Sequence, residues 1–154
     1  MKGDPKIIAA LNERLSEELT AVSQYMVHTE MCANWGYSKL ADKVEHRAID
    51  EMKHAEKLIG RILFLNGMPI VSNLGKMNIG AKVDTQLRND LESELGAVVV
   101  YNASIKQAVE MGDNGTRELF ESILQDEEAH IDWLEAQLDQ IDQMGLANYL
   151  ETQV

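Results

Sequence analysis

The chain has 154 residues and carries 26 acidic against 14 basic side chains, which gives a net charge of −12. This negative charge disfavours nucleic acid or an anionic membrane as a partner and favours the attraction of cations. No apolar run approaches the roughly 18 residues of a membrane span, and the N-terminus lacks the apolar segment of a signal peptide. The single cysteine, Cys32, allows no internal disulfide and is typical of a reducing compartment. We therefore expect one domain, residues 1–154, in the cytoplasm.

The first half of the chain predicts two helices. Asp4 followed by Pro5 is a helix start, a capping side chain with proline at the first helical position. Apolar residues then recur at helical spacing until the pattern breaks near residues 34–36. A second stripe runs from Leu40 to Leu65 and ends at Asn66–Gly67. The break between the stripes is short, so the two helices form an antiparallel hairpin.

The second half predicts another hairpin, followed by a short tail. Its stripes run over residues 87–105 and 119–141, with a glycine-rich turn at residues 112–115 between them. The tail, residues 146–154, is long enough for a short fifth helix. The connection between the hairpins, about 17 residues, spans roughly 55 Å when extended and can run back along a whole helix. We expect an all-α, antiparallel four-helix bundle with one long crossover and a short C-terminal fifth helix, which is the ferritin-like topology.

One set of polar residues occurs twice, at a constant offset of 76 positions. The two sets are Glu18, Glu51 and His54, and Glu94, Glu127 and His130. All six lie on the apolar stripes, where buried and unpaired carboxylates are costly. No Lys or Arg lies in register with them, and the nearest, Arg47, is one turn away. Two divalent cations would balance the four carboxylates while the histidines bind as neutral imidazoles, and this oxygen and nitrogen ligand set favours iron or manganese. One Glu-x-x-His is an ordinary surface pattern, but two copies, each with a Glu 33 residues upstream, predict a dinuclear metal site.

Four further residues have positions that allow two interpretations each. Tyr25 and Tyr101 follow Glu18 and Glu94 by seven residues, on nearly the same helix face. They either hydrogen-bond to metal ligands or supply an electron, or they fill the core. Asp50 and Asp126 directly precede two of the repeated glutamates. They either accept hydrogen bonds from the metal-binding histidines or are ordinary surface acids.

At these positions, and nearly end to end, the sequence resembles the bacterioferritin family. The similar segments are residues 1–4, 50–55, 62–65, 126–132 and 144–150. The resemblance implies a ferroxidase centre with two iron ions per subunit, in which Glu18 and His54 are terminal ligands of one iron. Glu94 and His130 would be terminal on the other iron, with Glu51 and Glu127 bridging the two. It further implies a hollow homo-oligomer of 24 subunits, in which Fe(II) is oxidised by dioxygen or peroxide and stored as ferric mineral.

The resemblance also implies a b-type haem bound by Met52, one per subunit pair. Helix geometry agrees that Met52 faces out of its bundle, about 100° from Glu51; without the resemblance it would be interpreted as a contact to another helix. His46 and Asp50 resemble the family's iron site on the cavity surface, although a solvated polar pair fits them nearly as well. A bacterioferritin-associated ferredoxin would deliver electrons through the haem. His28 is interpreted as structural.

Two other classes of protein remain open at this stage. One is another di-iron or dimanganese enzyme, such as a rubrerythrin-type peroxidase, an oxygenase or a manganese catalase. Rubrerythrins usually append a Cys-x-x-Cys iron domain, which one cysteine cannot form. The other is a passive container or a small DNA-protecting shell protein, which need not keep all six ligands within one bundle. Particle size and bound cofactor would separate these alternatives.

Overall fold

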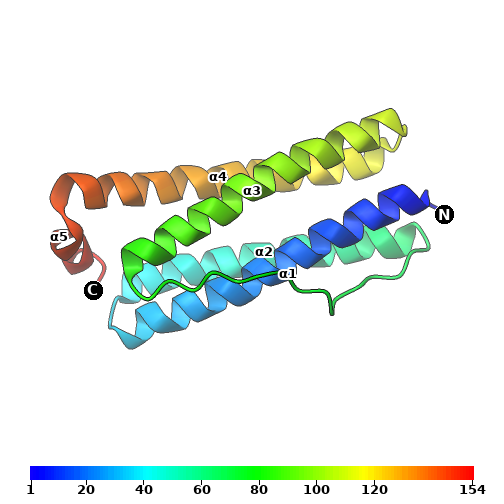
Figure 1. Ribbon diagram of the computed structural model, residues 1–154. Helices are drawn as coiled ribbons and strands as arrows, with labels where there is room; N and C mark the ends of the chain where they lie inside the picture. Colours follow the sequence, from blue (N-terminus) through cyan, green and yellow to red (C-terminus); the bar gives the residue numbers. More distant parts are fainter.

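The computed structural model describes residues 1–154 and is entirely helical, as predicted (Figure 1). The helices are α1 (Pro5–Asn34), α2 (Ser38–Phe64), α3 (Val83–Glu110), α4 (Asn114–Met144) and α5 (Leu146–Glu151). The first four form the expected bundle of two antiparallel hairpins, α1–α2 and α3–α4, and α5 turns across one end of it. No helix is both long enough and apolar enough to cross a membrane.

The helix ends follow the local signals in the sequence. The Asp4 carboxylate accepts a hydrogen bond from the backbone N–H of Lys6 at 2.8 Å and so caps α1. Asp113 caps α4 in the same way, accepting from the N–H of Thr116 at 3.0 Å. Gly36 and Gly112 follow α1 and α3 with φ of 84° and 69°, a conformation that a residue with a Cβ adopts only with strain. These glycines allow the two tight hairpin turns.

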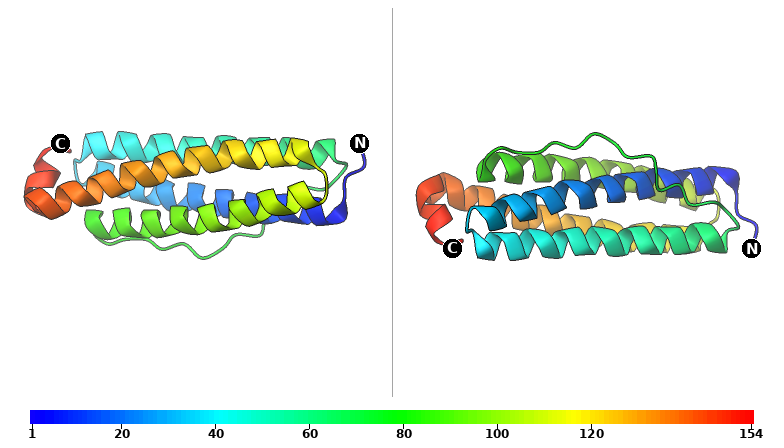
Figure 2. Two further views of the ribbon diagram at one scale, coloured as in Figure 1. Left: turned by 90° about the horizontal axis from the view of Figure 1, so that it is seen from above. Right: turned by 90° about the horizontal axis from the view of Figure 1, so that it is seen from below.

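The crossover, residues 65–82, runs along the outside of α1 and α3 without regular structure (Figure 2). Four polar side chains of α1, spaced four residues apart, hold it in place: Asn12, Ser16, Thr20 and Gln24. Asn12 donates to the carbonyl of Met68 at 3.1 Å, and Thr20 accepts from the N–H of Gly75 at 2.8 Å. Gln24 accepts from the N–H of Asn78 at 2.9 Å. The backbone of the crossover therefore finds its hydrogen-bond partners on α1 instead of in a sheet or helix.

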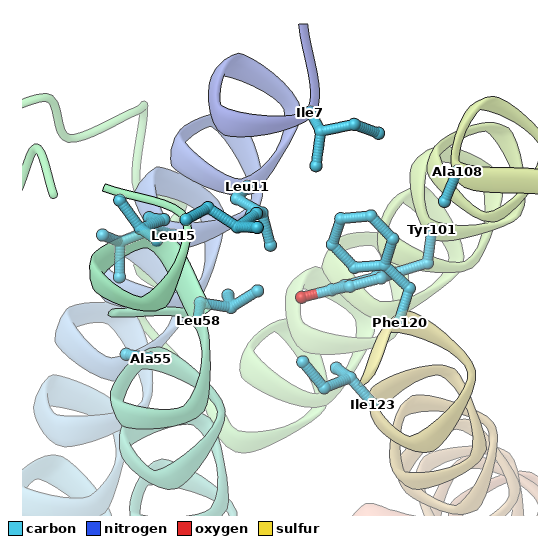
Figure 3. Close-up of a cluster of buried hydrophobic side chains, with 11 residues drawn as sticks. Ile7, Leu11, Leu15, Ala55, Leu58, Tyr101, Ala108, Phe120 and Ile123 are labelled. Atoms are coloured by element: carbon cyan, nitrogen blue, oxygen red, sulfur yellow. The ribbon is translucent and has the colours of Figure 1, made fainter. Parts of the chain in front are cut away.

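The apolar core consists of two clusters that lie toward opposite ends of the bundle. One contains Leu11, Leu15, Leu58, Phe120 and Ile123, all at most 1% exposed (Figure 3). The other includes Leu40, Val44, Leu87 and Leu134, together with Tyr149 of α5. The six repeated polar residues occupy the middle of the same helices, between the clusters in sequence, and all six are buried.

Candidate metal centre

The four helices bring all six repeated residues together in the interior. Their ligand atoms form two groups, and within each group the atoms lie within 4.8 Å of one another. The groups are Glu18, Glu51, His54 and Glu127, and Glu51, Glu94, Glu127 and His130. Glu51 and Glu127 belong to both groups, which is the arrangement expected for carboxylates that bridge two metal ions. Each of the other four residues belongs to one group only.

The inward-facing atoms of this cluster lack hydrogen bonds. Nδ1 of His54 lies 3.0 Å from Oε1 of Glu127, and Nδ1 of His130 lies 3.1 Å from Oε1 of Glu51. These contacts are short enough for ion pairs but are not aligned as hydrogen bonds, and none of the four atoms has a hydrogen-bond partner. Buried polar atoms without partners are costly. Two cations between these atoms would satisfy them, so the cluster fits a pair of metal ions.

The outer nitrogens of the histidines are held by aspartates. Nε2 of His54 lies 2.9 Å from Oδ2 of Asp126, and Nε2 of His130 lies 3.3 Å from Oδ2 of Asp50. Each histidine is thus paired with the aspartate that precedes the bridging glutamate of the opposite hairpin. A proton shared with the aspartate at Nε2 leaves Nδ1 to point at a metal. Of the two interpretations given to Asp50 and Asp126, the structure supports the one in which they orient the histidines.

The two tyrosines bond across the bundle to the terminal glutamates. Tyr25 of α1 donates to Oε1 of Glu94 at 2.6 Å, and Tyr101 of α3 donates to Oε1 of Glu18. Burial, together with the neighbouring carboxylates, raises the pKa of both phenols well above the usual value. Both hydroxyls therefore stay protonated and fix the orientation of a carboxylate.

Arg47 is a member of this cluster that the sequence pattern did not identify. Although its Cα lies one turn from Glu51, its guanidinium reaches Oε1 of Glu94 at 3.0 Å and Oδ2 of Asp90 at 3.4 Å. It also stacks 4.3 Å from the centre of the Tyr25 ring. Burial alone would lower the pKa of Arg47, but Tyr25 and the two carboxylates outweigh it and raise the pKa. The spacing along the helix does not indicate this contact, because a long side chain can span a full helical turn.

Without metal, protons balance the charge of the cluster. Burial raises the pKa of Glu18, and it raises the pKa of Glu127 to about 12. Burial opposes charge on the two histidines as well, but contact with the glutamates outweighs it. The pKa of His54 is raised, and that of His130 rises to about 10. Polar contacts with their neighbours outweigh burial at Glu51 and Glu94 and lower the pKa of both.

Of the remaining candidate residues, His46, Met52 and His28 lie apart from the six ligands. His46 is exposed and donates from Nδ1 to the carbonyl of Asp42 at 2.6 Å, whereas Asp50 faces His130. The structure therefore gives His46 and Asp50 separate partners. Met52 lies on the surface of α2, as predicted, and is 45% exposed. His28 is buried and accepts from the N–H of Gly80 at 3.1 Å, which agrees with a structural role.

A cavity of about 410 Å³ connects the surface with the cluster. Exposed residues of the crossover and α3, among them Lys76 and Glu92, line its outer part. Its inner part reaches all four repeated glutamates, together with Tyr25 and Tyr101. A small ion or diatomic molecule can therefore approach the metal-binding atoms from the side of the bundle that the crossover covers.

A four-helix bundle with one long crossover and a buried pair of Glu-x-x-His motifs defines a ferritin-like domain. The family profile of the ferritin-like domain matches residues 8–144 of this chain. Curated relatives are similar over almost their whole length. A bacterioferritin of Brucella melitensis is 42% identical over 149 residues, which cover 97% of this chain and 92% of the relative. A bacterioferritin of Rhodobacter capsulatus is 43% identical over 145 residues, which cover 94% of this chain and 90% of the relative. The chain belongs to the bacterioferritin family.

Proposed function

We propose that the protein stores iron and that its six-residue cluster is a ferroxidase centre, which oxidises Fe(II) to Fe(III). One observation carries this proposal: four buried ligand atoms, two imidazole nitrogens and two carboxylate oxygens, face one another without hydrogen bonds. Similarity to bacterioferritins supports the storage role. Iron is the substrate, and the cavity beneath the crossover is its route to the centre.

The chain's own residues would act by holding two Fe(II) ions and balancing their charge. Glu18 and His54 would bind one ion, Glu94 and His130 the other, and Glu51 and Glu127 would bridge them. Each Fe(II) gives up one electron, and dioxygen or peroxide takes both electrons together with protons. The bridging carboxylates keep the ions close enough to deliver the two electrons as a pair. The ferric product is then enclosed as mineral.

Enclosure requires an assembly, and we propose a homo-oligomeric shell of about 24 subunits. The family relationship supports a shell. The partly exposed apolar side chains of Leu146 and Leu150, on α5 at the end of the bundle, suit a contact between subunits. Light scattering should show a large hollow particle across low and high salt. A protein that remains monomeric or dimeric under all these conditions would not be a storage shell.

Met52 would hold a b-type haem, one per subunit pair. The structure offers an exposed thioether with the exposed apolar side chains Met26 and Ile49 on the same hairpin, which suits an apolar macrocycle between subunits. When bound, the haem would supply one-electron transfer for reductive release of iron. We propose that a small ferredoxin supplies those electrons. We propose no role in iron binding for His46.

The ferroxidase proposal is tested by replacing a bridging carboxylate. Glu127→Ala should abolish the rapid oxidation of the first two Fe(II) per subunit, measured by stopped-flow absorbance. Glu128→Ala is the matched control, because Glu128 is adjacent and exposed and should leave the rate unchanged. Parental initial rates in Glu127→Ala would place the oxidation elsewhere.

A further inference from the structure

The two halves of the centre share their proposed ligands but not their surroundings. The residues that surround Glu94 include Arg47 and Asp90, both buried. At an offset of 76 positions, the counterpart of Arg47 is Ile123 and the counterpart of Asp90 is Arg14. The repeat is therefore broken at the positions next to the ligands, and only one half of the centre contains a buried arginine in contact with a terminal glutamate.

The glutamate oxygens that face the two histidines also differ in their hydrogen bonds. Oε1 of Glu94 lies 3.5 Å from Nδ1 of His130, and the same oxygen accepts from Tyr25 at 2.6 Å and from Arg47 at 3.0 Å. Glu18 is arranged differently. Its Oε2 lies 3.5 Å from Nδ1 of His54, whereas Tyr101 bonds to Oε1. A metal beside His54 therefore meets a glutamate oxygen that no tyrosine or arginine occupies.

A buried network holds Arg47 in this position. Oδ1 of Asp90 accepts from Gln24 at 2.8 Å and from Nδ1 of His28 at 2.9 Å, which leaves Oδ2 for Arg47. In the other half, Arg14 is also buried and lies over the ring of Tyr101, 6.0 Å from its centre, but its partners are not ligands. It pairs with Glu17 at 2.9 Å and donates to Ser104 at 2.7 Å, without contacting Glu18.

We propose that Arg47 makes the two metal positions inequivalent, so that the position formed by Glu18 and His54 fills first and the position formed by Glu94 and His130 fills second. This inference rests on the proposed function. A cation that binds the Glu94 oxygen facing His130 competes with two hydrogen bonds for the electron density of that oxygen. It must also bind next to the guanidinium charge, in an interior that screens charge poorly. Arg47 is a positioning residue, because it acts through Glu94 and not on the metal directly.

Metal occupancy gives a direct test. The probe is Co(II), which has visible absorption bands and is stable in air, added to the assembled metal-free protein. Titration of the parental protein should give two phases, one ion each per subunit, with affinities separated by about tenfold or more. Anomalous scattering from crystals with one equivalent of Co(II) should show higher occupancy beside His54 than beside His130. Equal occupancy, or higher occupancy beside His130, would overturn the inference.

Variants then identify the cause of the difference. Arg47→Met combined with Asp90→Asn removes the buried ion pair without leaving either charge unpaired. In this double variant the two Co(II) affinities should differ by less than about threefold. Arg47→Lys keeps the charge and should keep two phases. The control, Arg14→Met with Glu17→Gln, removes an ion pair from the other half and should leave both phases unchanged. If the two Co(II) affinities of the Arg47 and Asp90 double variant differ as much as those of the parental protein, the proposed role of Arg47 is refuted.

The occupancy measurement also separates this inference from the proposed function. If Co(II) binds to none of the six residues, the proposed metal centre itself fails. If two ions bind with equal affinity, the centre stands and only the inequivalence fails. The crystals of the parental protein give this answer even where the double variant does not fold.

Discussion

At the scale of single residues, the proposed metal centre depends on side chains outside its set of six ligands. The aspartates at Nε2 of His54 and His130 set the direction of each imidazole, and the two tyrosines set the direction of each terminal glutamate. These contacts run from one hairpin to the other. The same interactions that orient the ligands therefore also hold the two halves of the bundle in register.

Replacement of Asp126 tests this orienting role. Asp126→Ala should weaken metal binding by about 10- to 100-fold, because His54 loses the acceptor that fixes its ring. Co(II) titration of the assembled protein measures the loss. Asp132→Ala is the control, since Asp132 is also exposed on α4 and should bind as the parental protein does. Equal affinities in the two variants would show that Asp126 is only a surface acid.

The pKa values of the metal-free centre predict that metal and protons compete. Glu127, with a pKa of about 12, and His130, with a pKa of about 10, both hold protons at pH 7 and must lose them to bind metal. Binding should therefore release at least two protons per subunit and strengthen as pH rises through neutrality. Calorimetry in buffers of different ionisation enthalpy counts the protons. Binding without proton release would mean that the metal-free centre is already deprotonated.

The stability of the metal-free fold depends on pH in the opposite direction to metal binding: protonation of His130 stabilises the fold, whereas it weakens metal binding. Its pKa in the folded protein, about 10, lies above the ordinary value of 6.5. The stabilisation from its charged form is complete below about pH 6.5 and is lost as pH rises toward 10. The metal-free protein should therefore lose stability as pH rises from about 6.5 toward 10. The metal-bound protein should not show this loss, because its stability does not depend on that proton.

At the scale of secondary structure, caps and turns determine where the helices begin and end, and hydrogen bonds from α1 hold the crossover in place. Asp113 combines several contacts, because its carboxylate accepts from the N–H and hydroxyl of Thr116 and pairs with Arg61 at 2.7 Å. Burial acts against its charge, but these bonds prevail and lower the pKa of Asp113. The charged cap thereby stabilises the start of α4 next to the hairpin turn.

Loss of this cap should be measurable. Asp113→Ala should destabilise the fold by about 1 kcal/mol, seen as a lower Tm at neutral pH. The folded pKa is lowered, so the stabilisation is present above about pH 3.8 and is lost as pH falls through the folded value. The Tm difference between variant and parent should therefore close in acid. Asp142→Ala, at the other end of α4, serves as the control.

At the scale of the whole molecule, one bundle cannot complete every proposed site. Met52 points away from its own bundle, so each subunit offers a single thioether from this position. Two subunits related by a two-fold axis would present two such sulfurs to one haem. Held by Met52 of both subunits, the haem would supply one-electron transfer when bound.

Replacement of Met52 tests this arrangement. Met52→Leu should lose the haem, because leucine keeps the apolar volume but has no sulfur, and Fe(II) oxidation should continue. The absorption spectrum and the haem content per subunit measure the result, which should be one haem per two subunits in the parental protein. Met26→Leu, another exposed methionine of the same hairpin, should retain haem. An unchanged spectrum in Met52→Leu would refute the assignment.

The sequence by itself determined the helices, their antiparallel order and the six residues of the cluster. The reason is that helical spacing and caps are local signals, and the 76-residue offset compares the chain with itself. The predicted ends were close: the hairpin turn near residues 34–36 follows α1, which ends at Asn34, and the short fifth helix is α5.

Only the tertiary structure decided what surrounds those residues. The pairing of His54 with Asp126 crosses between hairpins, and the reach of Arg47 to Glu94 depends on side-chain direction as well as on spacing. Such contacts join residues far apart in the chain through flexible side chains, so a pattern read along one helix does not contain them. At the 76-residue offset Arg47 has Ile123 as its counterpart, but only the tertiary structure shows that the Arg47 guanidinium contacts a terminal glutamate while the buried Arg14 of the other half does not.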